Sequence, residues 1–419
     1  MKPLYIFAFL MGNMIAAQCA TAQDFVIRGA TVHTASSKGT LKNTDVVVRG
    51  GVIVAIGPES GAASSAAVID AKGKELTPGL FGGLTDIGLD EIAEESQTVD
   101  STLNLKSPGW QQQWRPELDV TLAYNPRSFV VPVTRIEGVT WTVLAPNNGD
   151  SIIGGQGSAV TLDGRYDAGL NGSRSLFVQM GSAGARVAGG TRAAEYMLLE
   201  QAIREARAQG PIGQGALLHA AGREALMRYL MGGRVVFQVD RAADILSVVT
   251  FAERNGMKAV ILGGDEAWLV AKELARANVP VILNPLNDLP ADFDRLGATL
   301  ENAARLQHAG VRIAFSSGDT PQARLIRQLA GNAVAHGLPW ESALAAITST
   351  PADIFGLGAT HGRIAVGQAA DLVLWSGDPL EVTTLADQVW IAGHPVEMKS
   401  RQTELRDRYV EKVKAHQAR

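Results

Sequence analysis

Between residues 139 and 336, short apolar runs alternate with amphipathic segments of helical length. Runs at 234–239 and 258–262 have the length of strands, and residues 242–255 between them carry apolar side chains at the spacing of one helix face. Repeated units of this kind bring parallel strands together under a cover of helices, so the pattern predicts an α/β fold. Alternation over about 270 residues favours a TIM-type (β/α)8 barrel, with an open doubly wound sheet as the alternative.

Strand-like segments with glycine turns flank this middle region at both ends of the chain. Residues 45–57 have the pattern of a hairpin, and residues 362–375 likewise combine short apolar runs with glycine turns. We therefore expect residues 23–76 and 362–398 to form one small composite β-sandwich domain around a barrel at 77–361. Residues 399–419 are rich in charge and are predicted to form a helical C-terminal tail.

The first 22 residues have the pattern of a secretory signal peptide. Lys2 precedes an apolar run at 4–17, and Ala20-Thr21-Ala22 forms a cleavage site before Gln23. A membrane anchor is the alternative, but the run is short for a helix that spans a bilayer. Cleavage would remove Cys19, the single cysteine. The expected location is periplasmic or secreted, with no membrane span after cleavage.

The charge balance argues against a nucleic-acid partner. The formal net charge is -4, and the basic residues do not gather into a cluster. Proteins that bind nucleic acids need such a cluster to neutralise phosphates. With 46% hydrophobic residues, the chain has ample material for a globular core.

Three motifs resemble a known family. Pro78-Gly79-Leu80 and the stretch GRIAVGQAADLVLWSGDP at 362–379 are similar to the opening and closing segments of the amidohydrolase superfamily. The segment GVTWTVLAPNNGDSIIGGQGSAVTLDG at 138–164 resembles the secreted, imidazolonepropionase-like branch of that superfamily. The resemblance implies a (β/α)8 barrel with a composite β domain, and relatives that hydrolyse C–N bonds.

The resemblance also implies a metal site at the carboxyl ends of the barrel strands. Imidazole and carboxylate ligands there hold zinc-like ions that activate water. In this chain the metal-ligand motifs are degenerate. The family's ligand positions fall on Leu84, Asp86, Gln238, Gly263 and Gly318, with Asp319 one residue late.

Nothing else in the chain restores the expected ligands. No lysine occurs between Ser107 and Met257 to bridge two metal ions, and none of the seven histidines follows an expected strand end. We therefore expect no metal and no cofactor, and a pseudoenzyme that binds a small-molecule ligand or a partner. The partner would be a second copy or an active amidohydrolase relative. The alternative is a working hydrolase of C–N bonds, with a rebuilt, carboxylate-based site and one divalent metal ion. Its candidate catalytic residues are Asp86, Gln238 and Asp319.

Several acidic side chains lie near the expected ligand positions. Clustered carboxylates at strand ends can bind a hard cation such as Ca²⁺ or Mg²⁺. They can also cap helices or lie in solvated loops, and this second interpretation is favoured because Asp265 and Asp319 both precede helical segments. The residues concerned are Asp86, Asp240, Asp265, Glu266 and Asp319.

Overall fold

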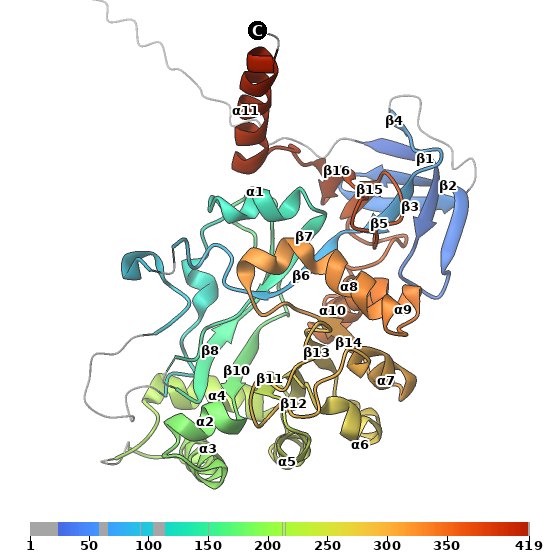
Figure 1. Ribbon diagram of the computed structural model, residues 1–419. Helices are drawn as coiled ribbons and strands as arrows, with labels where there is room; N and C mark the ends of the chain where they lie inside the picture. The colour runs from blue at the N-terminus through green and yellow to red at the C-terminus, as the bar shows by residue number, and fades with distance from the viewer. Residues whose placement is uncertain are drawn as a thin grey trace, which may run out of the picture.

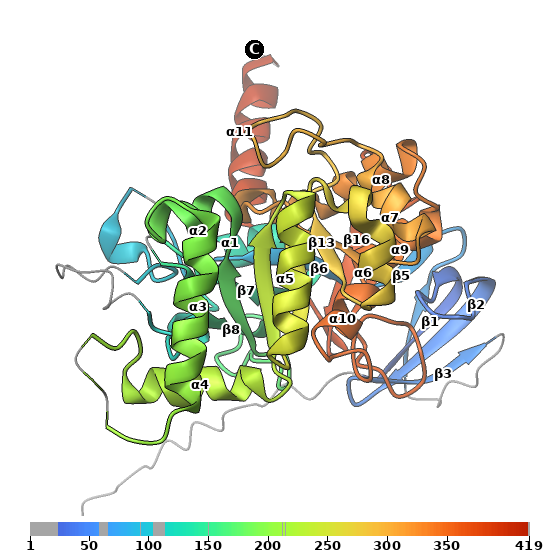
Figure 2. The same ribbon diagram turned by 90° about the horizontal axis from the view of Figure 1, so that it is seen from below.

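The structure is a computed structural model that describes residues 24–57, 66–92, 94–103, 114–149, 151–211, 213 and 215–417. It is an α/β protein in which helices cover the outside of a group of parallel strands (Figures 1 and 2). A smaller β region built from both ends of the chain lies to one side (Figure 1). The proposed signal peptide at 1–22 lies outside the described residues.

The main sheet has six strands in the order β14-β13-β12-β11-β10-β8. Strands β10 to β14 are parallel to their neighbours, and β8 at the edge is antiparallel. The strands are β8 (Ile153–Gly157), β10 (Ser175–Gln179), β11 (Arg234–Val239), β12 (Lys258–Gly263), β13 (Val281–Leu283) and β14 (Ile313–Phe315).

A second sheet has three strands, β6 (Leu80–Thr85), β7 (Val139–Leu144) and β9 (Ala159–Thr161). Both sheets contribute to one buried apolar cluster, which takes side chains from β6, β7 and β9 and from each of β10 to β14. The two sheets therefore enclose a common core, as the strands of a barrel would.

The hydrogen-bonded ladder between the two sheets is nevertheless not continuous in the described residues, so the predicted closed (β/α)8 barrel is not confirmed. At one seam the Leu84 N–H donates to Ser316 Oγ, at 3.0 Å, in place of a backbone ladder. Gly83 has a φ of +91°, and a Cβ at this position would lie 2.7 Å from Ser316 Oγ. At this seam Ser316 therefore packs closely against the backbone of β6.

The helices bury their apolar faces against the strands. In α5, for example, Ile245, Val248 and Phe251 are buried, which is the face that the spacing predicts. The helices are α1 (Val130–Arg135), α2 (Gly181–Val187), α3 (Arg192–Arg207), α4 (Ala220–Leu230), α5 (Ala242–Arg254), α6 (Ala271–Arg276), α7 (Asn302–His308), α8 (Ile326–Ala335), α9 (Trp340–Ala346), α10 (Ser349–Ile354) and α11 (Arg401–Gln417).

Strands from both ends of the chain form one eight-stranded sheet in the order β17-β16-β15-β5-β1-β2-β3, with β4 paired to β1. The hydrogen bonds join these strands into a single sheet, and side chains from β1, β2, β3, β5, β15 and β16 share one buried core. The strands are β1 (Phe25–His33), β2 (Thr40–Arg49), β3 (Val52–Gly57), β4 (Ala67–Asp70), β5 (Glu75–Pro78), β15 (Leu372–Trp375), β16 (Ala386–Ile391) and β17 (His394–Pro395).

Strand β15 connects this sheet to the rest of the molecule. It pairs antiparallel with β5, and its side chains alternate between two cores. Leu372 and Leu374 belong to the core of the terminal sheet, whereas Val373 and Trp375 belong to the large core under the helices. Trp375 Nε1 also donates to Thr77 Oγ1 at 2.9 Å.

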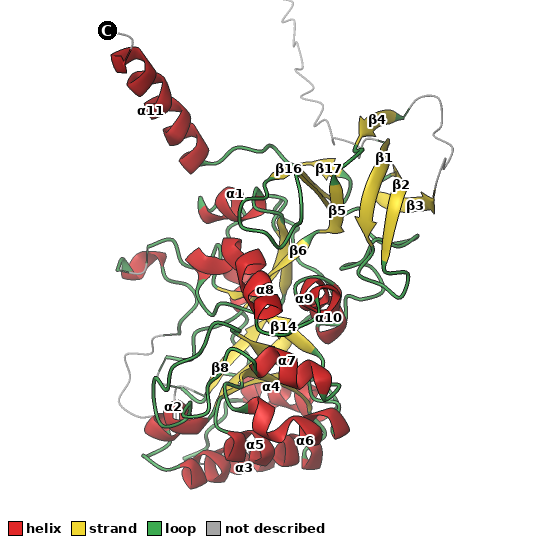
Figure 3. Ribbon diagram, turned by 45° about the vertical axis from the view of Figure 1, so that its right-hand side comes forward, coloured by secondary structure: helices red, strands yellow, loops and turns green. Residues whose placement is uncertain are grey.

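The charged tail forms helix α11, which extends away from the body of the protein (Figure 3). Most of its described side chains are exposed. Within the described residues, no helix combines the length and the apolar character that a membrane crossing requires.

Candidate functional site

A cavity of about 490 Å³ opens at the carboxyl ends of the parallel strands. Its lining comes from the ends of β6, β7 and β10 to β14, and from the loops that follow them. Parallel strands direct all of these ends to one edge, which is where α/β proteins place their ligand sites. The fold thus concentrates side chains from seven separate segments at one place.

The five positions at which the resemblance expects metal ligands all line this cavity. They are Leu84, Asp86, Gln238, Gly263 and Gly318. Asp319, the third candidate catalytic residue, does not line it. Asp319 is exposed and occupies the N-cap of the short 3-10 helix Thr320–Leu325, but its side chain makes no capping hydrogen bond. It therefore belongs to a solvated loop.

Asp86 is the one carboxylate among those five positions. Its backbone N–H donates to Thr320 Oγ1 at 2.9 Å. Burial raises the pKa of the Asp86 carboxyl, and the hydrogen bond from the Thr320 side chain partly offsets this effect. A carboxyl with a raised pKa at a cavity wall is a group that can give or accept a proton.

Arg295 lies between the acidic side chains on the other side of the cavity. Its Nε is 3.2 Å from Asp240 Oδ2 and 3.6 Å from Asp265 Oδ2. Asn287 Nδ2 also donates to both oxygens of Asp265, at 2.9 and 3.1 Å. The guanidinium thus lies between two carboxylates and compensates part of their negative charge.

The expectation that Asp265 caps a helix or lies in a solvated loop is wrong. Its side chain is only 2% exposed and faces Arg295 and Asn287. Burial raises the pKa of Asp265, while the hydrogen bond from Asn287 and the charge of Arg295 lower it. Burial also raises the pKa of Asp240 to about 6, and the nearby negative charge of Asp265 adds to that effect.

Glu266 has a structural role in two backbone contacts. One carboxylate oxygen accepts the Ala242 N–H at the start of α5, and the other accepts the Gly297 N–H, both at 3.0 Å. The carboxylate therefore joins a helix N-terminus to the loop that carries Arg295. Negative charge at a helix N-terminus is favourable, so this contact stabilises the rim of the cavity.

Several cavity residues lie outside the family motifs. Gln179 at the end of β10 is in register with Gln238 of β11, and both line the cavity. The sequence does contain a pattern that points to Gln179, since the apolar runs of β10 and β11 each carry a glutamine near the carboxyl end. Arg295 and Asn287 lie in loops and Thr320 begins a short 3-10 helix, and no local pattern marks these three residues.

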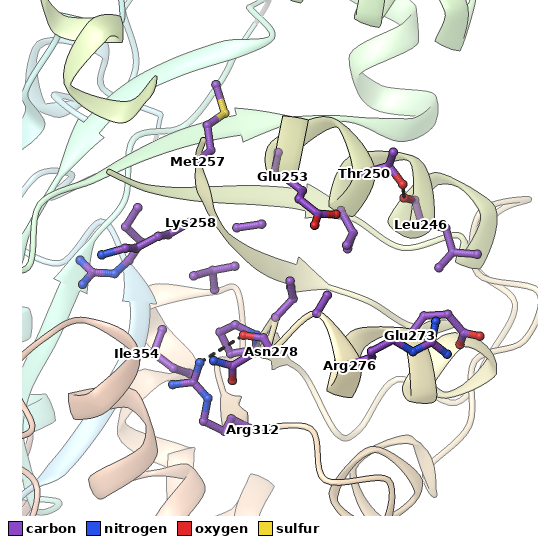
Figure 4. A pocket seen from close by; sticks show the side chains of 18 of the residues that line it. Leu246, Thr250, Glu253, Met257, Lys258, Glu273, Arg276, Asn278, Arg312 and Ile354 are labelled. Carbon is purple, nitrogen blue, oxygen red and sulfur yellow. Dashed lines mark hydrogen bonds between the residues drawn. The ribbon is translucent and has the colours of Figure 1, made fainter. Parts of the chain in front are cut away.

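A larger hollow of about 830 Å³ lies at the opposite, amino ends of β11 to β14, between α5 and α6 (Figure 4). Charged side chains of both signs surround it, including Glu253, Lys258 and Arg276. Arg312 Nη2 donates to the Asn278 carbonyl oxygen at 3.3 Å, as the dashed line shows (Figure 4). None of the expected ligand positions lies here.

The residues at the cavity do not fit a binuclear metal centre. Leu84 offers no donor atom, and a Cβ added at Gly263 would collide with Asp240 Oδ1, so this space cannot hold an imidazole without movement of Asp240. Across the described part of the chain, His, Cys, Asp and Glu side chains do not gather in groups of three or more that could hold a metal ion. Zinc sites usually take three or four such donors.

The model of the amidohydrolase family matches residues 177–403, which is more than half of the chain. The chain belongs to the amidohydrolase family. The match begins in β10 and ends in α11, so it includes β11 to β14, whose ends line the cavity, and β15 to β17 of the terminal sheet.

Known proteins agree with the family assignment. The imidazolonepropionase of Chromobacterium violaceum is 26% identical over 372 residues, which cover 80% of this chain and 86% of that protein. The crystal structure of an amidohydrolase from Thermotoga maritima MSB8 is 26% identical, with a TM-score of 0.75 over 90% of this chain and all of that one. A short segment of 58 residues is 48% identical to amidohydrolase tasK of Hapsidospora irregularis, but it spans only 6% of that protein.

Proposed function

We propose that this amidohydrolase-family protein has lost metal-dependent hydrolysis and uses the cavity at the strand ends to bind a small molecule or a partner. The observation that carries this proposal is that the positions at which the family resemblance expects metal ligands hold Leu84, Gln238, Gly263 and Gly318, which all line one cavity. Arg295 supports it, because its guanidinium already compensates the carboxylates of Asp240 and Asp265. We also propose that the two sheets correspond to a distorted (β/α)8 barrel, since they share one core.

Metal content tests the proposal directly. We expect the purified mature protein to hold less than about one tightly bound transition-metal ion for every two chains, because one carboxylate cannot replace several charged or imidazole donors. Elemental analysis without added chelator measures this. Leu84→His and Gln238→His, each made singly, should not recover metal, because the remaining ligands stay absent.

The alternative hydrolase is supported by one observation, the raised pKa of the Asp86 carboxyl at the cavity wall. That hypothesis predicts that Asp86→Ala and Asp319→Ala each abolish hydrolysis of a C–N bond while the fold is kept. Stoichiometric metal that survives dialysis and is lost in those two variants would overturn the pseudoenzyme proposal. The exposed position of Asp319 outside the cavity lining argues against its part in such a site.

We further propose that the protein is exported. Cleavage of the signal pattern should leave a mature chain that begins at Gln23 and contains no cysteine, since Cys19 is the only one in the sequence. N-terminal sequencing of protein recovered from the periplasm or the medium checks this expectation. Recovery of a cytoplasmic chain that still begins at Met1 would contradict it.

The second form of the proposed binding function is association with a protein partner in place of a small molecule. The proposed partner is another copy of the chain or an active amidohydrolase relative, as inferred from the family resemblance. Size-exclusion chromatography with light scattering on the purified protein, alone and mixed with such a relative, would measure either association. A strictly monomeric protein that does not bind the relative would contradict the partner proposal, and small-molecule binding alone would remain.

A further inference from the structure

A single row of residues crosses the floor and one wall of the cavity. Gln179, Gln238, Leu262 and Ile282 are paired in register on four adjacent parallel strands. Two residues earlier on β10 and β11 the inward positions hold Phe177 and Val236, which belong to the buried core between the sheets. The row therefore marks the level at which the apolar core ends and the cavity begins.

The cavity has an apolar floor and polar walls. Leu84, Leu262 and Ile282 line it and belong to, or pack against, the apolar core beneath. The walls carry neutral amide and hydroxyl groups from five separate segments. These groups include Gln179, Gln238, Asn147, Asn284, Ser317 and Thr320. A ligand that fits must combine an apolar face with hydrogen-bonding groups around its edge.

The charged groups of the cavity disfavour an anionic ligand. The positive charge of Arg295 is compensated by Asp240 and Asp265. An anionic ligand would also face the carboxylate of Asp86, and like charges at short range repel. Carboxylates and carboxamides instead accept hydrogen bonds from hydroxyl groups, and carboxamides also donate them.

We propose that this cavity binds a small neutral sugar. This inference names a ligand for the proposed binding function, and it rests on the proposed loss of metal-dependent hydrolysis. A sugar ring presents C–H groups on its face, which suit the floor, and hydroxyls around its edge, which suit amides on several segments. A simple lactam presents its polar atoms along one edge only and would leave most of these amides without a partner. The volume of about 490 Å³ lies within the range of small-molecule sites.

Isothermal titration calorimetry on the full mature protein tests the proposal, with glucose, galactose and maltose as probes. We expect at least one of them to bind with a dissociation constant of about 1 mM or tighter. Gln179→Leu and Gln238→Leu, which keep the approximate side-chain volume, should each weaken that binding about tenfold through lost hydrogen bonds. Gln402→Leu, at an exposed position on α11, is the matched control and should have no effect.

Glucuronate and 2-pyrrolidone serve as comparison ligands in the same experiment. Tighter binding of either one, the absence of binding by all three sugars, or sugar binding that survives both leucine variants would overturn the proposal. Gln238→Glu replaces the leucine variant if that chain does not fold. A protein that is free of metal but binds no sugar would overturn only this inference, whereas metal-dependent amide hydrolysis would overturn the proposed function itself.

Discussion

A mature chain that ends at Thr360 is expected to be insoluble. The deletion removes β15, which pairs with β5 and contributes to two cores at once. Leu372 and Leu374 leave the core of the terminal sheet, and Val373 and Trp375 leave the core under the helices. Each fully buried apolar side chain contributes about 1.5–3 kcal/mol. The combined loss is comparable to the whole stability of a typical domain, about 5–15 kcal/mol.

A chain that ends at Met398 is the matched control for this deletion. It lacks only the terminal segment with α11, which is largely exposed, and it should remain soluble. The soluble fraction after expression and the urea unfolding curve, followed by circular dichroism, measure both chains. A soluble chain that ends at Thr360 and unfolds cooperatively would show that the two terminal β segments do not depend on one another.

Arg295→Ala is expected to destabilise the protein by about 2–3 kcal/mol, toward the low end of the cost of breaking a buried ion pair because Arg295 is one-third exposed. The variant leaves Asp240 and Asp265 with 12% and 2% of their side chains exposed and without a positive partner. Urea unfolding at neutral pH measures the change. Arg228→Ala is the matched control, because its ion pair with Glu224 is exposed and should cost less than about 1 kcal/mol.

The effect of Arg295→Ala should depend on pH. Burial already raises the pKa of Asp240 to about 6 in the folded protein, from an ordinary value of 3.8. A group with a raised folded pKa favours the folded state while it is protonated, and this contribution is lost as the pH rises through the folded pKa. Removal of the guanidinium raises that pKa further. The penalty should therefore be larger at about pH 8 than at about pH 5.

A second substitution checks that the uncompensated carboxylates cause the loss of stability in Arg295→Ala. Asp240→Asn in the Arg295→Ala background removes one of the uncompensated charges, so it should restore part of the lost stability and reduce the dependence on pH. An Arg295→Ala protein that is as stable as the parent chain at both pH values would contradict the role assigned to this guanidinium.

The order of strands and helices could be predicted from local pattern alone. The helix expected at 242–255 is present as α5 (Ala242–Arg254), and the strand expected at 234–239 has the same bounds in the structure. Side-chain periodicity depends only on neighbours along the chain, so it can be read without tertiary contacts. The same holds for Leu84, Gln238 and Gly263, whose places follow from motifs at the ends of these strands.

Closure of the sheets could not be predicted in this way. The seam between β6 and the end of β14 brings together Gly83 and Ser316, which are 233 positions apart in the sequence. The side chain of Ser316 takes the hydrogen bond that a neighbouring backbone would otherwise accept. The strand order of the terminal sheet likewise depends on which strands meet in space.

The sequence by itself determined the alternating α/β organisation and which residue types stand at the expected ligand positions, because both depend on residue types at fixed spacings. Only the tertiary structure decided which side chains surround those positions. Asp265 precedes a helical segment and has the local pattern of a cap, but burial beside Arg295 and Asn287 makes it part of an ion-pair cluster. Such partners come from different loops, and their distances are set by the folded sheet and not by the sequence around each residue.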